Sequence, residues 1–139
     1  MTSAARRGGG LVAVVSCALA VSACGTTVST SSFKGEEHAV AQAIANLQTH
    51  ATANEPSKIC GDDLAASVVA RLGGKSGCEA AIKTQLSEVE NLELSVQSIA
   101  LAAGGKSATA KVRSSHKNKM QSSQLALVKE GGSWKVSAL

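Results

Sequence analysis

The chain has 139 residues and a formal net charge of +4 at pH 7, with fourteen lysines and arginines against ten aspartates and glutamates. This length leaves room for one small domain and excludes a second. Aromatic side chains are scarce, with one phenylalanine, one tryptophan and no tyrosine. The scarcity argues against a pocket whose walls are aromatic, such as a planar substrate would need.

The N-terminal segment has the parts of an export signal. Arg6 and Arg7 supply the positive charge at its start, and an uncharged apolar run extends over residues 11–21. That run has the length of a signal-peptide core and is too short for a membrane-spanning helix, which needs about 20 apolar residues. The arginine pair leaves two export routes open, the general secretory route and the twin-arginine route.

Small residues follow the apolar run and lead to a cysteine, in the order Val21-Ser22-Ala23-Cys24. This order resembles the bacterial lipobox. The resemblance implies cleavage between Ala23 and Cys24 and attachment of a diacylglycerol to the Cys24 thiol. It therefore predicts a lipid-anchored protein on the extracytoplasmic face of the cell membrane, with residues 1–23 as a lipoprotein signal peptide. Secretion after cleavage at another alanine is the competing interpretation.

Removal of the leader leaves 116 residues with a formal charge of +2, because Arg6 and Arg7 are lost. So small an excess gives no support for a nucleic-acid partner. The charges are nevertheless unevenly distributed: residues 36–93 hold nine acidic and four basic side chains, and residues 106–139 hold seven basic and one acidic. We interpret the two halves as solvated faces of one domain that attract each other weakly.

Two cysteines, Cys60 and Cys78, remain once Cys17 is discarded with the leader and Cys24 is acylated. An even number of cysteines outside the cytosol predicts a disulfide. A zinc site would need further ligands at short spacing, and the three histidines are scattered along the sequence. We therefore expect no metal and no cofactor.

The first half of the domain has helical patterns. Residues 24–35 are rich in serine, threonine and glycine, which predicts a disordered tether after the acylated cysteine. Apolar residues then recur at three- and four-residue steps, which predicts helices over about 36–53 and 62–72 and a third that begins at Ser76. Ser76 and Glu79 have the spacing of a capping box. Cys60 and Cys78 would then join the second and third helices.

From residue 92 onward the apolar period changes to two. Alternation predicts strands over about 92–101, 106–115 and 121–129 and a last strand after Gly131-Gly132, with further turns at Gly104-Gly105 and at residues 117–119. A phase slip near Gln97-Ser98 predicts a bulge in the first strand. Trp134, Val136 and Ala138 should share one face of the last strand. The predicted fold class is α+β, with N-terminal helices packed on a curved four-stranded antiparallel sheet.

This order of elements, ending in the Gly-Gly-Ser-Trp134-Lys-Val136 hairpin, is similar to the nuclear transport factor 2-like superfamily of the cystatin-like class. The resemblance covers residues 36–139. It implies a cone-like fold with a pocket between helices and sheet, dimerisation through the sheet face, and a disulfide between the second and third helical segments, where Cys60 and Cys78 fall. It implies no single function, because this fold hosts enzymes as well as binding modules.

Catalytic residues are not evident in the sequence. Enzymes of the nuclear transport factor 2-like superfamily combine a carboxylate or histidine base with a tyrosine or another acid. This chain has no tyrosine. Asp62 and Asp63 have the position of helix-start carboxylates. His38, His50 and His116 are expected at the surface.

We therefore predict a binding module for a small apolar ligand or an envelope partner, without catalysis; the alternative is a pocket enzyme of isomerase or dehydratase type. If the partner is acidic or an anionic headgroup, the sheet face would contact it. Five basic residues would lie along the edge of that face: Lys106, Lys111, Arg113, Lys117 and Lys119.

Overall fold

The computed structural model describes residues 28–89, 92–116 and 118–138, without the side chain of His116. The fold is α+β, as predicted. The elements in chain order are α1 (Gly35–Thr52), α2 (Pro56–Lys58), the π-helical turn η1 (Ile59–Asp63), α3 (Ala66–Arg71), α4 (Gly74–Glu88), β1 (Glu93–Leu101), β2 (Ser107–His116), β3 (Lys119–Glu130) and β4 (Ser133–Ala138).

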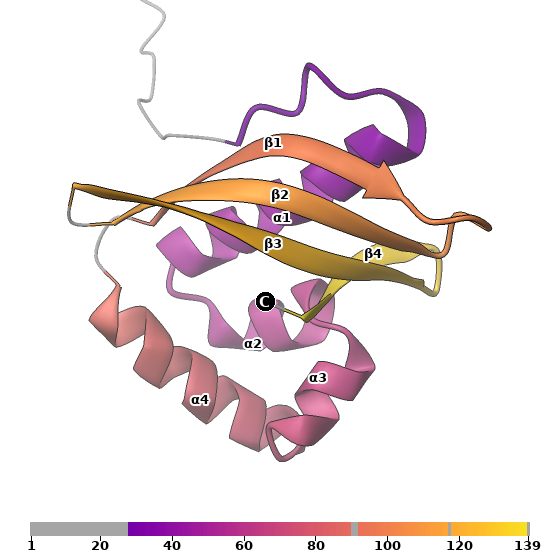
Figure 1. Cartoon of the computed structure of the whole chain (residues 1–139). Coiled ribbons are helices and arrows are strands. Elements are labelled where there is room, and N and C mark those ends of the chain that lie inside the picture. Colours follow the sequence, from indigo (N-terminus) through magenta and orange to yellow (C-terminus); the bar gives the residue numbers. More distant parts are fainter. Residues whose placement is uncertain (1–27, 90–91, 117, 139) are drawn as a thin grey trace, which may run out of the picture.

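The four strands form one antiparallel sheet in the order β1-β2-β3-β4, each paired with its neighbour in sequence. Figure 1 shows this sheet as a curved layer, with α1 crossing behind it and α2, α3 and α4 grouped beneath. The predicted bulge is confirmed, because the register of β1 against β2 shifts between Val96 and Ser98.

The core lies between α1, η1 and the inner face of the sheet. Alternation in β2 and β3 buries one face of each strand, so that the neighbouring side chains point to solvent. The largest fully buried side chains come from both layers: Val40, Ile44, Ile59, Cys78, Val112, Leu127 and Val136. The buried inner face of the sheet matches the prediction, including Trp134 in β4.

The end of β4 differs from the prediction. Leu127 pairs with Val136 and Ala126 pairs with Ala138, so the register shifts by one residue at Ser137. Ala138 is consequently exposed instead of sharing the buried face of Trp134 and Val136. A register shift of one residue moves a side chain to the other face of a sheet.

The single helix predicted over residues 62–72 is wrong. This range holds the end of η1 and the short helix α3 instead, and Leu64 and Ala65 between them are extended. Leu64 forms a parallel bridge with Val136, and the Ala65 amide donates to the Val136 carbonyl over 2.9 Å. These contacts cover the edge of β4, which would otherwise present unpaired backbone groups. The tertiary contacts with β4 therefore override the local helical pattern.

The predicted capping box at Ser76 is also wrong. Helix α4 begins two residues earlier, at Gly74, and no side chain caps it. Gly73 precedes it with φ of +90°, a conformation that favours glycine. Gly77 is required for a steric reason, because a Cβ atom at this position would collide with the carbonyl oxygen of Leu72. The two helices α3 and α4 can therefore meet at a tight corner.

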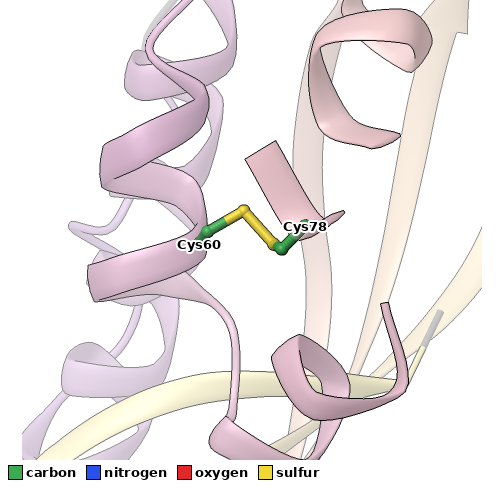
Figure 2. Close-up of a disulfide and its surroundings, with 2 residues drawn as sticks. All are labelled: Cys60 and Cys78. Carbon is green, nitrogen blue, oxygen red and sulfur yellow. A yellow bond between two sulfur atoms is a disulfide. The ribbon is translucent and has the colours of Figure 1, made fainter. Parts of the chain in front are cut away.

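The predicted disulfide is present. Cys60 in η1 and Cys78 in α4 are joined, with their Cα atoms 6.1 Å apart, which is an ordinary separation for a disulfide. Figure 2 shows the two sulfur atoms bridging the gap between the helical turn and the facing helix. Both cysteines are buried. The bond therefore attaches α4 to η1 inside the helical layer.

The tether was predicted to be disordered over residues 24–35, and the structure describes part of it, from Val28 onward. Val28 is only 5% exposed. The Phe33 amide donates to the Thr30 carbonyl, and the hydroxyls of Ser29 and Ser31 are 3.3 Å apart. Residues 28–34 contain this one buried side chain and a turn, and they form neither a helix nor a strand.

Candidate functional site

A cleft of about 640 Å³ lies where α1, η1 and the β3–β4 hairpin meet. These elements also contact one another in the core. The residues that line the cleft are His38, Ala39, Gln42, Ala43, Asn46 and His50 of α1, Asp62 and Asp63 of η1, and Gly132, Ser133, Trp134 and Lys135 of the hairpin. Most of these side chains are polar. The cleft therefore differs from the apolar cone that the sequence led us to expect.

One wall of the cleft is a polar row on α1. His38, Gln42, Asn46 and His50 recur at every fourth residue, so they follow one face of the helix at intervals of about 6 Å. The Gln42 amide nitrogen donates to the Asn46 side-chain oxygen over 3.1 Å. The opposite face of α1 carries the buried residues of the core. We call these four residues the α1 polar row.

The inner end of the polar row is a buried ionisable pair. His50 Nδ1 lies 2.7 Å from Asp63 Oδ2. The Asp63 side chain is 5% exposed and the His50 side chain 19%. Burial raises the pKa of the Asp63 carboxyl above its usual range, and the hydrogen bond with His50 opposes that rise.

The sequence-based interpretation of Asp63 was wrong, and that of His50 was only partly right, because its side chain is partly buried. His50 was expected at the surface, and Asp63 was expected to begin a helix. Asp63 instead ends η1 and turns into the core. The pairing was missed because thirteen residues and an irregular turn separate the two side chains. The four-residue spacing of the polar row was the available signal, since it places His50 on the same face as Gln42 and Asn46.

A carboxylate outside the lining, that of Glu36, holds the start of α1. Glu36, in the first turn of α1, accepts hydrogen bonds from Lys129 Nζ over 2.8 Å and from Trp134 Nε1 over 2.9 Å. The hydrogen bond from Lys129, followed by that from Trp134, lowers the pKa of the Glu36 carboxyl below its usual range. The Lys129 ammonium also lies 5.8 Å from the centre of the Trp134 ring. These contacts attach the start of α1 to the β3–β4 hairpin.

Lys135 closes the third side of the cleft. Its ammonium donates to the backbone carbonyl oxygens of Gly61 and Asp62, over 2.9 and 3.0 Å. The Asp62 side chain is exposed beside it. Lys135 therefore neutralises the carbonyl end of η1 and holds that turn against β4.

The other predicted site residues divide into two groups. Ala23, Cys24, Lys117 and the His116 side chain lie outside the described residues. Lys106, Lys111, Arg113 and Lys119 are all exposed. Of these, Lys111 and Arg113 alternate with the buried Ala110 and Val112, so they point away from the helices on the outer face of the sheet.

Metal ligation has no support in the part of the chain that the structure describes. No group of three or more histidine, cysteine, aspartate or glutamate side chains there could hold a metal ion. None of the described helices is both long and apolar enough to cross a bilayer.

The chain was compared with protein-family models, with curated proteins and with solved structures, and none of the three comparisons found a match. The function is therefore argued from the site itself.

Proposed function

We propose that the protein is a lipid-anchored extracytoplasmic binding protein, attached to the cell membrane through Cys24, whose domain holds its ligand in the cleft beside α1. The observation that carries the proposal is the α1 polar row facing the β3–β4 hairpin across a cleft of about 640 Å³. Small-molecule sites occupy roughly 300–1,000 Å³ and orient their ligands with a few convergent polar groups. The cleft has both properties.

The disulfide supports an extracytoplasmic location. Disulfides persist in oxidising compartments and are rare in the cytosol, and Cys60 and Cys78 are joined. The leader predicted from residues 1–23 provides the route to such a compartment. The order of helices and strands is also the order that a nuclear transport factor 2-like domain would have, a fold whose members include binding modules.

Binding is tested by native mass spectrometry of the full chain extracted from its own membranes. Gln42→Trp places a large side chain in the cleft from an exposed helix position, and Gln85→Trp makes the same change on the exposed face of α4. We expect a bound small molecule in the wild type and in Gln85→Trp, and none in Gln42→Trp. A wild-type chain without any bound mass, or one that keeps it in Gln42→Trp, would refute the proposal.

Anchoring is tested separately. Cys24→Ala removes the thiol that receives the lipid, so incorporation of a labelled fatty acid should be lost. Cleavage after Ala23 depends on this acylation, so the variant should also keep residues 1–23. Equal labelling of Cys24→Ala and wild type would overturn the anchor and would leave the binding proposal standing.

The second candidate function is a proton-transfer enzyme of isomerase or dehydratase type, and the His50–Asp63 pair is the observation that favours it. Asp63 engages Nδ1 of His50, which leaves Nε2 as the nitrogen that could accept a proton from a substrate. A substrate screen would distinguish the candidates. Turnover that His50→Gln abolishes and His38→Gln preserves would establish the enzyme; ligand binding without turnover would exclude it.

A further inference from the structure

We infer that the ligand of the cleft is a neutral, polyhydroxylated molecule, that is, a carbohydrate. This inference rests on the cleft being the binding site, and it concerns only the chemical class of the occupant.

The positive charge at the cleft is already engaged. Lys135 is the one lysine or arginine among the described lining residues, and its ammonium is bonded to two backbone carbonyl oxygens. Lys129, outside the lining, is paired with Glu36. With neutral imidazoles, Asp62, Asp63 and Lys135 give the lining a formal charge of −1. A phosphate or carboxylate ligand would therefore meet repulsion and would have no cation free to pair with it.

The cleft also offers little stabilisation to a cationic ligand. Asp63 is committed to His50, and the remaining carboxylate, Asp62, is exposed to water, where an ion pair contributes little. An ammonium group would gain most from an aromatic face. Trp134 is only 5% exposed, and Lys129 already lies over its ring.

The groups that remain are suited to hydroxyls. Within the Gln42–Asn46 hydrogen bond, the Gln42 carbonyl oxygen and the Asn46 amide nitrogen are not consumed, so one acceptor and one donor stand about one helical turn apart. His38 and Ser133 each add a group that can both donate and accept. A hydroxyl also donates and accepts, so a sugar can match these groups without carrying a charge.

The lining also has an apolar part. Ala39 and Ala43 lie beside the polar row, and Trp134 lines the cleft from the hairpin. These side chains can contact the C–H groups of a sugar ring. The polar row spans about 18 Å from His38 to His50, since each helical residue advances about 1.5 Å, which is long enough for more than one ring.

Three disaccharides with related frameworks and different charges test this class on the full chain in detergent. They are neutral N,N′-diacetylchitobiose, its deacetylated diamine, and a uronic acid disaccharide. Binding is followed by ligand-observed NMR and by the emission of Trp134, which is the single tryptophan of the sequence and lines the cleft. We expect the neutral disaccharide to bind and both charged ones to bind at least about tenfold more weakly.

Asn46→Leu and Gln85→Leu are the matched variants, because both remove an exposed helical amide and Asn46 alone lines the cleft. Asn46→Leu should weaken neutral binding about fivefold, the effect of one ordinary hydrogen bond, and Gln85→Leu should leave it unchanged. Preferential, Asn46-dependent binding of a charged disaccharide would overturn the carbohydrate class and retain the cleft as a site. Failure of all three would overturn the class, and the bound mass sought by native mass spectrometry would then decide the proposed function separately.

Discussion

The sheet and the helical segment over residues 56–73 are held together in different ways. Each strand of the sheet pairs with the next one in sequence, and alternate side chains form the inner face. Residues 56–73, which we call the cross-linked segment, form pieces of three, five and six residues. Helices this short are not stable by themselves.

Several long-range links fix the cross-linked segment. They include the Cys60–Cys78 disulfide, the His50–Asp63 pair, the hydrogen bonds from Lys135 to the end of η1, and the pairing of Leu64 and Ala65 with Val136. Two of them, at Asp63 and at Lys135, also shape the cleft. The candidate site therefore lies between the regular sheet and the cross-linked segment, whose conformation depends on these long-range contacts.

The largest expected effect is a loss of stability caused by a change in the sheet. Trp134→Ala removes a buried aromatic from β4 and should lower the free energy of unfolding by about 3–5 kcal/mol, as measured by urea denaturation. Trp134→Phe is the control, because it keeps most of the buried surface and loses the hydrogen bond to Glu36. A loss below about 1 kcal/mol in Trp134→Ala would show that the core does not depend on this side chain.

Removal of the disulfide should weaken the cross-linked segment more than the sheet. The double variant Cys60→Ser, Cys78→Ser should lose about 2–4 kcal/mol, because the unfolded chain regains the freedom of an 18-residue loop. Amide hydrogen exchange gives the location of the effect. Protection should fall first in residues 56–88 and persist in β2 and β3; a uniform fall along the chain would contradict the distinction between the two regions.

The same distinction explains how far the sequence could predict the structure. The strands, their turns, the bulge at Val96–Ser98 and the burial of Trp134 follow from alternation and glycine placement, which are local signals. The disulfide followed from the cysteine count. The break at Leu64–Ala65 and the His50–Asp63 pair could not be predicted in the same way, because each depends on a residue that only the folded chain brings near. For the candidate site, the polar row was readable on α1, whereas the facing wall required the fold.

A smaller effect is expected at the corner between α3 and α4. Gly77→Ala introduces a Cβ atom that collides with the Leu72 carbonyl, so the backbone must shift, and a loss of about 1–3 kcal/mol is expected. Gly61→Ala is the matched control within the cross-linked segment, since its Cβ atom would meet open space. It should be neutral or stabilising by up to about 1 kcal/mol. Equal losses in the two variants, measured by thermal unfolding, would remove the packing explanation.

The smallest effect distinguishes Asp63, which lines the cleft, from Glu36, which holds the start of α1 against the hairpin, by the sign of its pH dependence. Burial raises the pKa of Asp63, so its ionisation opposes folding, and stability is lost as the pH rises from about 3.9 through the higher folded value. The hydrogen bonds from Lys129 and Trp134 lower the pKa of Glu36, so its contribution is present above about 4.3 and is lost as the pH falls through the lower folded value.

The test is the free energy of unfolding between pH 3 and 7 for the wild type, Asp63→Asn and Glu36→Gln. The difference between wild type and variant should decrease with rising pH for Asp63→Asn and increase for Glu36→Gln. Both variants keep a side chain of similar size, so packing changes little and the pH dependence isolates the charge. Parallel pH dependences would show that Asp63, within the cross-linked segment, is stabilised as a carboxylate in the same manner as Glu36 in the first turn of α1.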